Sequence, residues 1–299
     1  MIWLMGNKGM LGTELTLLLK KNKLPFVGTD REVDITDYNA LKKFCENKSI
    51  NWIINCVAYT AVNEAEENIE LCRRINTFGA GNIAILAKYI NARLIHISTD
   101  YVFDGKKVAG QETLHPYRED DETNPISVYG LSKRDGEITV LENNPASYII
   151  RTSWLYGKYG NNFIRTMLKL MNERDVIKVI NDKRGSPTWT YDLAFVIIDL
   201  IRQTDEGSAI PYGIYHYSNE GNISWFDLAM EIYIKGRGFG LLTKNCDVIP
   251  CNSDDFPYNI KRPAYSILDK TKIKSTLKIN IPLWDESFQK YLINNEVVL

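Results

Sequence analysis

The sequence predicts an α/β protein with a Rossmann-type, doubly wound parallel sheet and a smaller C-terminal mixed α/β domain. Short apolar runs alternate with helical patterns from the N-terminus to about residue 152, as strands and helices do in a parallel sheet covered on both faces. The first run, residues 2–5, stops at a glycine-rich turn that leads into a helical pattern. This strand, turn and helix are typical of the start of that fold.

The turn after the first strand has the spacing of a pyrophosphate site. Gly6 would allow a tight turn, Gly9 a close approach of phosphate, and Gly12 close packing of helix on strand. The helix N-terminus that follows presents backbone amides, including those of Met10 and Leu11, to an anion. We therefore predict that these residues bind the dinucleotide of a cofactor.

The second predicted strand, residues 25–29, ends at Asp30. An acid at this place can accept hydrogen bonds from the ribose hydroxyls of adenosine, which favours NADH. Arg31 follows directly and would instead suit the 2'-phosphate of NADPH, so the choice of cofactor stays open. In the next loop, Asp34 and Ile35 are placed to line an adenine pocket.

A third apolar run, residues 52–57, is the next predicted strand, and a long helical pattern over residues 65–91 follows it. Open parallel sheets bind ligands at the carboxyl ends of their strands. We therefore predict cofactor contacts at the strand ends, from Val57, Ala58, Tyr59 and Ile97.

The central stretch of the chain joins a buried strand to a helix. The strand, residues 94–98, leads into Thr99, and the helix opening near Ser127 carries Tyr129 and Lys133 four residues apart, hence on one face. A lysine cation ~4 Å from a phenol would lower the pKa of the phenol by roughly 3 units. If the Thr99 hydroxyl faced the same point, a carbonyl would lie between two hydrogen-bond donors.

The spacing of Tyr129 and Lys133 is not specific by itself. Tyr38 and Lys42 repeat it, and one chance match is expected among 17 tyrosines. The context separates the pairs, because Tyr129 follows a buried strand that ends in Ser-Thr. We interpret Tyr38 as an ordinary surface helix residue.

The regular alternation continues through one more strand, residues 148–152, and breaks beyond Trp154. The remaining predicted elements are a strand at 176–180, a helix at 190–203, a strand at 213–219 and a helix near 283–294. We predict one domain from residues 1–154 with about 189–219, and a second from about 155–188 and 220–299.

Composition narrows the class of protein. The chain has 299 residues, is 44% hydrophobic and carries a formal net charge of −1, so nothing attracts it generally to nucleic acid or to an anionic membrane. The five cysteines are scattered without paired metal-ligand spacing, as expected for reduced thiols. Since no signal-peptide layout and no apolar run near ~18 residues is present, we expect a soluble cytoplasmic protein.

The assembled motifs resemble those of the extended short-chain dehydrogenases/reductases, and within them a branch acting on nucleotide sugars. The resemblance covers nearly the full length. It rests on residues 6–12, Asn55 with 58–62, 98–105, 129–133, 151–156, 160–163, 180–182, 185–188, and Arg262 with Pro263.

The resemblance implies the roles of the central residues. Tyr129 would be the proton donor, and Lys133 would hold both Tyr129 and the nicotinamide ribose. Thr99 would bind the substrate ketone, with Asp100 beside it. The implied reaction is NADPH- or NADH-dependent reduction of the C4 ketone of dTDP-4-dehydro-L-rhamnose to dTDP-L-rhamnose.

The resemblance also implies a pocket for the dTDP-sugar. Trp154 would stack in the sugar and nucleotide pocket, Asn162 would contact the substrate, and Arg262 would reach its phosphates. Some relatives use Mg²⁺ at a subunit contact; Glu14 matches part of that pattern, but the other carboxylates cannot be placed. We therefore assign no metal ligands, and a homodimer stays open.

Other functions share parts of this pattern. Nucleotide-sugar 4,6-dehydratases typically carry an acidic pair after the threonine, whereas Tyr101 follows Asp100 here, which argues against dehydration. A 4-epimerase is an alternative that would retain its cofactor through purification. A non-catalytic binder, like the regulatory subunit of methionine adenosyltransferase, is a second alternative that would show no turnover.

Overall fold

The structure is a computed structural model that describes residues 1–106, 115–255 and 261–294. Its centre is a six-stranded sheet in the order β10-β5-β4-β3-β1-β2, in which every neighbouring pair is parallel. The strands are β1 (Ile2–Met5), β2 (Phe26–Thr29), β3 (Trp52–Asn55), β4 (Arg93–Thr99), β5 (Ser147–Thr152) and β10 (Gly213–His216). The predicted doubly wound parallel fold is confirmed.

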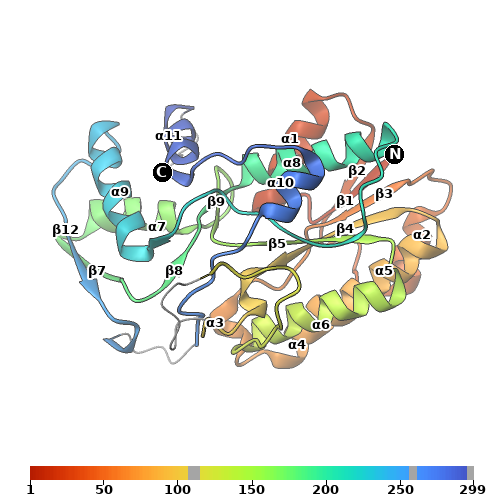
Figure 1. Ribbon diagram of the computed structural model, residues 1–299, viewed down its shortest axis with the longest axis horizontal. Coiled ribbons are helices and arrows are strands. Elements are labelled where there is room, and N and C mark those ends of the chain that lie inside the picture. The colour runs from red at the N-terminus through yellow and green to blue at the C-terminus, as the bar shows by residue number, and fades with distance from the viewer. Residues whose placement is uncertain (107–114, 256–260, 295–299) are drawn as a thin grey trace.

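Helices cover both faces of this sheet (Figure 1). On one face lie α1 (Met10–Lys21), α8 (Thr190–Asp205) and α10 (Thr271–Leu277); on the other lie α2 (Tyr38–Cys45), α5 (Ala80–Tyr89) and α6 (Val128–Asn143). Successive side chains of β1 point to opposite faces, so Ile2 and Leu4 join the first core and Trp3 and Met5 the second. Because both faces are buried, the central strands are apolar without a polar alternation.

The strand order reverses between β1 and β3, which is where open α/β sheets bind ligands. The glycine-rich turn follows β1, and Val57 to Tyr59 follow β3. Strand β3 ends at Asn55, two residues earlier than predicted. The Asn55 side chain accepts the Val57 N–H at 3.0 Å, so this backbone leaves the sheet beside the switch point.

The single long helix predicted over residues 65–91 is interrupted. A short α3 (Val62–Ala65) is followed by α4 (Ile69–Arg73), which continues through a π-helical turn, η1 (Arg74–Gly79), into α5. Such turns are rare and frequent at functional sites. Here the turn carries Asn76, whose side chain reaches the loop after β3.

A second lobe lies beside the carboxyl edge of the sheet (Figure 1). Its core is formed by α7 (Phe163–Glu173), α9 (Trp225–Gly238) and α11 (Trp284–Ile293) around the parallel pair β7 (Val176–Ile180) and β12 (Asp247–Cys251). Two short pairs complete it: β6 (Leu155–Tyr156) with β9 (Thr188–Trp189), and β8 (Arg184–Gly185) with β11 (Ile223–Ser224). The C-terminal segment serves both lobes, because α10 packs on the sheet and α11 in the second lobe.

Candidate active site

The start of α6 places Tyr129 against the end of β4. Ser127 caps the helix by accepting the Gly130 N–H at 3.1 Å. A side chain on Gly130 would collide with the Tyr101 carbonyl, so only glycine lets α6 approach the 3₁₀ turn η2 (Asp100–Val102) this closely. The Tyr129 side chain is thereby buried, and the Thr99 side chain lies close enough to its hydroxyl to lower the pKa of the phenol, against the larger effect of burial.

Asp100 forms a hydrogen bond with the Thr99 side chain. The Thr99 hydroxyl donates to Asp100 Oδ1 at 3.1 Å and accepts the Tyr101 N–H at 3.2 Å. Asp100 also bonds the Ser266 side chain, while its second oxygen, Oδ2, is buried with no hydrogen-bond partner among the described residues. Burial raises the pKa of Asp100 to about 6, so the carboxylate is held in a site that disfavours its charge.

Lys133 lies one helical turn beyond Tyr129 and is 1% exposed. Its Nζ donates to the Ile97 carbonyl at 2.7 Å and faces His96 Nε2 at 3.3 Å. Burial lowers the pKa of Lys133 to about 8. The ammonium form of this lysine is therefore easier to deprotonate than that of an exposed lysine.

The predicted lowering of the Tyr129 pKa is wrong. Burial raises this pKa well above its ordinary value, and the Asp100 carboxylate adds to the effect, although the Thr99 hydrogen bond opposes it. The prediction assumed that the Lys133 cation points at the phenol, whereas its hydrogen bonds go to Ile97 and His96. The resting state of Tyr129 is consequently the neutral phenol.

The glycine-rich turn has the shape of a pyrophosphate cradle. Gly6 has a φ of 74°, and a Cβ there would lie 3.0 Å from the Cys56 carbonyl carbon. A Cβ on Gly12 would collide with the Gly6 carbonyl. Gly9 caps α1 without any side-chain hydrogen bond. The amides of Met10 and Leu11, at the start of the helix, are therefore not covered by a capping side chain. These residues fit a dinucleotide.

The predicted adenosine contacts surround the end of β2. The Thr29 carbonyl accepts the Gly6 N–H at 2.7 Å, which brings Asp30 and Arg31 next to the glycine-rich turn. Asp30 is half-buried and Arg31 exposed. This placement suits either a free ribose or a phosphorylated one and leaves the cofactor choice open.

The two loop residues predicted near adenine differ in burial. Asp34 is exposed and accepts both the N–H and the hydroxyl of Thr36 at 2.8 Å. Ile35 is 6% exposed, and its side chain lies so close to Gly79 that a Cβ there would meet it at 2.6 Å. Both adenine contacts stay predictions.

Asn76 fixes the loop that carries Val57, Ala58 and Tyr59. Its Oδ1 accepts the Tyr59 N–H at 2.8 Å, and its Nδ2 donates to the Tyr59 carbonyl at 3.1 Å. The same Nδ2 lies 2.9 Å from the Ser132 hydroxyl on α6. Asn76 therefore links this loop to the helix of Tyr129 and Lys133.

Trp154 is held in a strained and tightly packed conformation. Its backbone has a φ of 47°, which is rare for a bulky residue. Its ring stacks on Trp225 with the centroids 3.5 Å apart, and any side chain on Gly185 would collide with it. Because Trp154 is still partly exposed, it presents a rigid aromatic surface at the junction of the two lobes.

The other two predicted substrate residues have different surroundings. Arg262 donates to Asn63 at 2.9 Å and bonds the Tyr101 side chain, whose ring lies edge-on to Tyr129 at 5.6 Å. Asn162 instead caps α7, accepting one backbone N–H and donating to one backbone carbonyl. The structure therefore brings Arg262 toward the Tyr129 region, while Asn162 is engaged in a structural cap.

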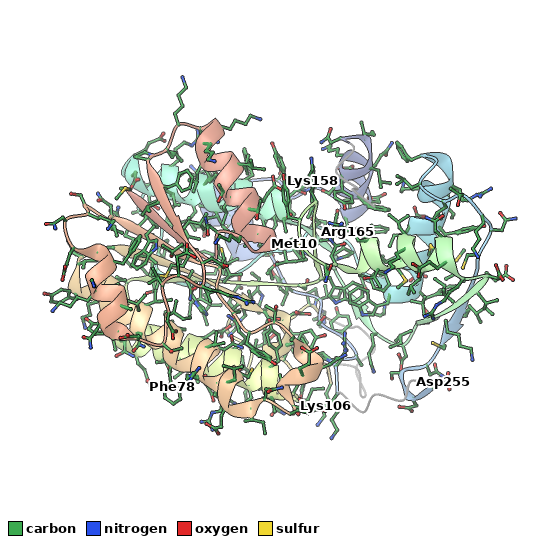
Figure 2. The ribbon with its side chains drawn as sticks, turned by 180° about the vertical axis from the view of Figure 1, so that it is seen from behind. Met10, Phe78, Lys106, Lys158, Arg165 and Asp255 are labelled. Atoms are coloured by element: carbon green, nitrogen blue, oxygen red, sulfur yellow. The ribbon has the colours of Figure 1, made fainter. Side chains whose placement is uncertain are left out.

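The second lobe also approaches the start of α1. A Cβ on Gly160 would lie 3.6 Å from the Met10 Cβ, and Arg165 ties this loop down by donating to the Lys158 carbonyl at 3.0 Å. Met10, Lys158 and Arg165 are seen together at the junction of the lobes in Figure 2. Lys158 thus stands on the loop that faces the predicted pyrophosphate site.

A buried charged network under the site was missed by the sequence analysis. Glu137 on α6 pairs with Arg151 on β5 at 2.7 Å, both side chains being 3% exposed, and accepts the Ser98 hydroxyl at 2.5 Å. Arg151 also faces His216 Nε2 at 3.3 Å. The available signal was an arginine inside an apolar strand pattern, which a buried position tolerates only with a partner.

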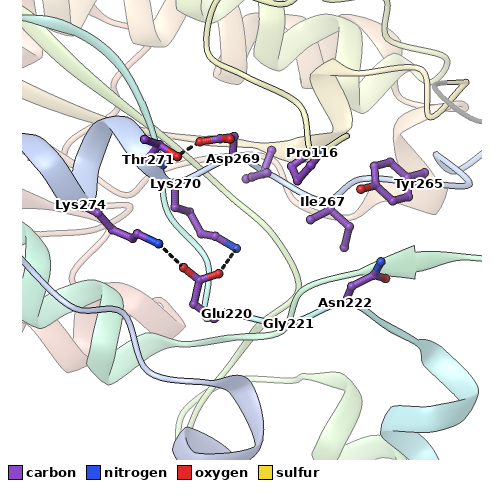
Figure 3. Close-up of a pocket in the computed structure, with 11 residues that line it drawn as sticks. Pro116, Glu220, Gly221, Asn222, Tyr265, Ile267, Asp269, Lys270, Thr271 and Lys274 are labelled. Carbon is purple, nitrogen blue, oxygen red and sulfur yellow. Dashed lines mark hydrogen bonds and ion pairs between the residues drawn. The ribbon is translucent and has the colours of Figure 1, made fainter. Parts of the chain in front are cut away.

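A hollow of about 350 Å³ lies beside the site (Figure 3). Tyr265 and Ile267 line it, whereas Ser266 between them bonds Asp100, so this segment separates the hollow from the Thr99 region. Across it, Lys270 and Lys274 both pair with Glu220. Its charges are thus compensated within the protein.

The described residues contain no group of three or more His, Cys, Asp or Glu side chains arranged to hold a metal ion. Within the same residues, no helix has the length and apolar character required to cross a membrane.

Comparisons with known proteins agree on one family. Residues 1–297 match the family described as RmlD substrate binding domain. The dTDP-4-dehydrorhamnose reductase of Aggregatibacter actinomycetemcomitans is 37% identical over 286 residues, 95% of each chain. A dTDP-4-dehydrorhamnose reductase structure from Clostridium acetobutylicum is 39% identical with a TM-score of 0.88 over 99% of both chains.

A further structure, the dTDP-4-dehydrorhamnose reductase of Bacillus anthracis in complex with NADP, is 35% identical with a TM-score of 0.88 over 98% of both chains. The matches cover both lobes and the glycine-rich turn alike. The chain therefore belongs to the RmlD family of dTDP-4-dehydrorhamnose reductases, within the extended short-chain dehydrogenases/reductases.

Proposed function

We propose that this protein is an NAD(P)H-dependent reductase that converts dTDP-4-dehydro-L-rhamnose into dTDP-L-rhamnose. One observation carries the proposal: the side chains of Tyr129 and Thr99 come together at the carboxyl end of β4, one helical turn from Lys133. A ketone oxygen at that point would accept from the Tyr129 hydroxyl, and from the Thr99 hydroxyl once its single proton turns away from Asp100. The named reductases among the relatives support the same chemistry.

The protein's own residues would position the ketone and deliver a proton. A bound nicotinamide dinucleotide supplies the hydride. The raised pKa of Tyr129 keeps the phenol protonated, and the phenol gives up its proton as alkoxide charge develops on the ketone oxygen. Asp100 accepts from Thr99 and so orients that hydroxyl. Proton donation by Tyr129 thus needs no lowering of its pKa in the resting state.

We further propose a division between the lobes. The sheet domain would bind the dinucleotide, and the second lobe with Trp154 and Arg262 would bind the dTDP-sugar. The rigid ring of Trp154 offers a stacking surface, and the guanidinium of Arg262 suits a diphosphate. Lys133 would hold the nicotinamide ribose as well as Tyr129.

The compartment and the oligomeric state belong to the same proposal. We place the enzyme in the cytoplasm, which agrees with the five cysteines being free thiols. A homodimer, and a Mg²⁺ ion at its subunit contact, stay open. Sedimentation of the purified protein with and without a chelator tests both, since a dimer that the chelator dissociates would require the metal.

The decisive experiment compares two tyrosines with the same spacing to a lysine. Tyr129→Phe should lower turnover at least ~100-fold, the usual loss for a general acid, while NADPH still binds. Tyr38→Phe, at the start of α2, should leave turnover unchanged. Both are assayed with dTDP-4-dehydro-L-rhamnose and either NADPH or NADH, following loss of reduced cofactor and identifying the sugar product. Near-normal turnover of Tyr129→Phe would refute the assignment.

A further inference from the structure

The Asn55 side chain has one possible orientation. It lies at the end of β3 and is 1% exposed. Its Oδ1 accepts the Val57 N–H at 3.0 Å, so the atom that faces His96 Nδ1 at 2.9 Å is the amide nitrogen Nδ2. An amide NH₂ group can only donate. His96 Nδ1 is therefore the acceptor and carries no proton.

The proton of His96 is consequently on its other ring nitrogen. His96 lies opposite Asn55 in the parallel register of β3 and β4, and burial lowers its pKa well below the ordinary value, so the ring is neutral. A neutral ring with a bare Nδ1 carries its proton on Nε2. That N–H faces Lys133 Nζ at 3.3 Å. An amine has a lone pair to accept it, whereas an ammonium has none.

The other groups around Lys133 complete its environment. The Ile97 carbonyl accepts from Nζ at 2.7 Å, which an amine and an ammonium can both satisfy. Glu137 on the same helix, Cys56 after β3 and Cys72 on α4 raise the pKa of Lys133, but burial outweighs them. The N–H donor of His96 favours the uncharged form of Lys133, as burial does.

We propose that His96 is a positioning residue for the reduction: held by Asn55, it donates its Nε2–H to Lys133 and favours the uncharged amine in the protein without cofactor. The consequence rests on the proposed function, in which Lys133 meets acceptors on Tyr129 and the nicotinamide ribose. Cofactor binding then involves proton uptake by Lys133. Affinity for NADPH should be highest where Lys133 is already charged and fall up to ~10-fold per pH unit above its titration.

The histidine tautomers test the geometry without any ligand. The chain has three histidines, and His115→Gln leaves the two buried ones. His216 is an internal control with the opposite tautomer. Its Nδ1 donates to the Tyr117 carbonyl at 3.1 Å, and its Nε2 faces the Arg151 guanidinium.

In ¹⁵N-histidine NMR spectra of the cofactor-free protein, His96 should be protonated on Nε2 and His216 on Nδ1. Neither should titrate between pH 6 and 8. Protonation of His96 on Nδ1, or an imidazolium at this site, would overturn the proposal.

Asn55→Asp tests the consequence for Lys133. The carboxylate would accept from both Val57 and His96 Nδ1–H, so the bare Nε2 would accept from a Lys133 ammonium. The pH at which NADPH affinity declines should then rise by at least ~1 unit. Asn51→Asp, just before β3 and exposed, adds the same charge away from His96 and should not move the profile.

A reversed tautomer with an unchanged profile in Asn55→Asp would contradict the link to Lys133. If that variant does not fold, the tautomers of the wild-type protein still decide the geometry. Neither measurement uses the sugar. Failure to reduce dTDP-4-dehydro-L-rhamnose with the predicted tautomers intact would thus count against the proposed function alone.

Discussion

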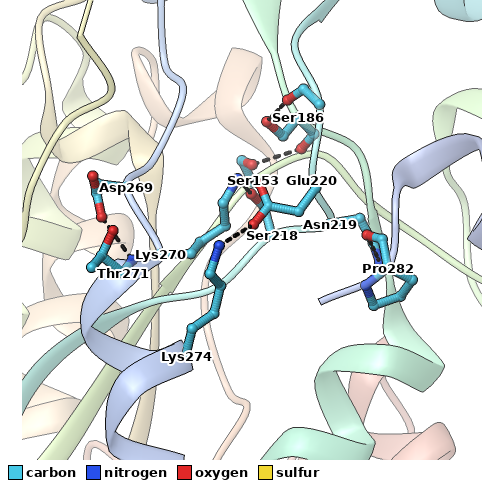
Figure 4. A network of polar contacts seen from close by, with 11 residues as sticks. Ser153, Ser186, Ser218, Asn219, Glu220, Asp269, Lys270, Thr271, Lys274 and Pro282 are labelled. Carbon is cyan, nitrogen blue, oxygen red and sulfur yellow. Dashed lines mark hydrogen bonds and ion pairs between the residues drawn. The ribbon is translucent and has the colours of Figure 1, made fainter. Parts of the chain in front are cut away.

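Two lysines are buried within the described residues, and their surroundings differ. Lys133 is 1% exposed, and its Nζ contacts a carbonyl and a neutral imidazole. Lys270 is 6% exposed and pairs at 3.1 Å with Glu220, which also binds Lys274 (Figure 4). Burial lowers the pKa of both lysines, but only Lys270 has a carboxylate at ion-pairing distance.

The difference separates a structural cation from a reactive one. Glu137, one turn from Lys133, directs its oxygens to Arg151 and Ser98. A buried cation with no ion-pair partner costs stability, and such groups concentrate at functional sites. Under the proposed function the charge of Lys133 is left for a bound cofactor to stabilise, whereas the charge of Lys270 is held by Glu220.

The largest expected effect is on turnover. Lys133→Met should lower turnover at least ~100-fold and leave the fold as stable or more stable. Lys270→Met should keep turnover within a few-fold and lower the free energy of unfolding by about 1–3 kcal/mol, because Glu220 loses a partner. Steady-state kinetics and urea unfolding of both variants measure this. Equal losses of turnover in the two variants would remove the distinction.

The two carboxylates extend the comparison. Glu137→Gln should destabilise the protein by about 3–5 kcal/mol, because it leaves Arg151 buried without a counter-charge. Glu220→Gln should cost less, about 1–3 kcal/mol, because it takes the counter-charge from the buried Lys270 but Glu220 itself is 28% exposed and water can reach Lys274. Urea midpoints at pH 7 test the ranking, and a larger loss for Glu220→Gln would reverse the comparison.

The sequence could predict the local structure of the site but not the partners of its buried charges. Local patterns predicted the parallel sheet, the glycine-rich turn and a helix opening at Ser127, because capping and periodicity are properties of neighbouring residues. They left it as a condition that Thr99 faces the same point as Tyr129, and the structure brings the two side chains together. The direction in which Lys133 points was not predictable, because it depends on which side chain of β4 packs beneath α6.

Other features also required three-dimensional information. The π-helical turn carries Asn76, whose side chain bonds a loop 17 residues earlier in the chain. The positive φ of Trp154 is imposed by packing between Trp225 and Gly185. The Glu137–Arg151 pair joins a helix and a strand whose register no local pattern fixes. Local patterns thus predict the scaffold and the candidate residues Thr99 and Tyr129, but not the charged side chains that lie beneath them.

An effect of intermediate size is expected on the pH dependence of the free energy of unfolding, through Lys133. The pKa of Lys133 is lowered from 10.5 to about 8 in the folded protein, so between these values the folded state binds fewer protons than the unfolded state. The free energy of unfolding from this group therefore rises with pH from about 8 to 10.5, by up to about 3 kcal/mol. Lys133→Met should lack this rise.

Urea unfolding of both proteins from pH 7 to 10.5 measures the difference and cancels titrations common to both. Cys56, whose pKa is raised to about 12, acts with the opposite sign in each protein and so drops out to first order. A constant difference across the range would mean that Lys133 is not desolvated in solution.

The smallest effect is expected at Lys274. Its side chain is 44% exposed and its partner Glu220 28%, so the pair at 2.9 Å is screened by water and salt. Lys274→Met should therefore change the free energy of unfolding by about 1 kcal/mol or less, and the change should shrink as NaCl is raised from low to molar concentration. The buried Lys270 contact should respond much less to salt, because solvent ions do not reach it. If both contacts were equally sensitive to salt, Lys270 would be as solvated as Lys274. Burial would then no longer distinguish the ion pair of Lys270 from an exposed surface pair.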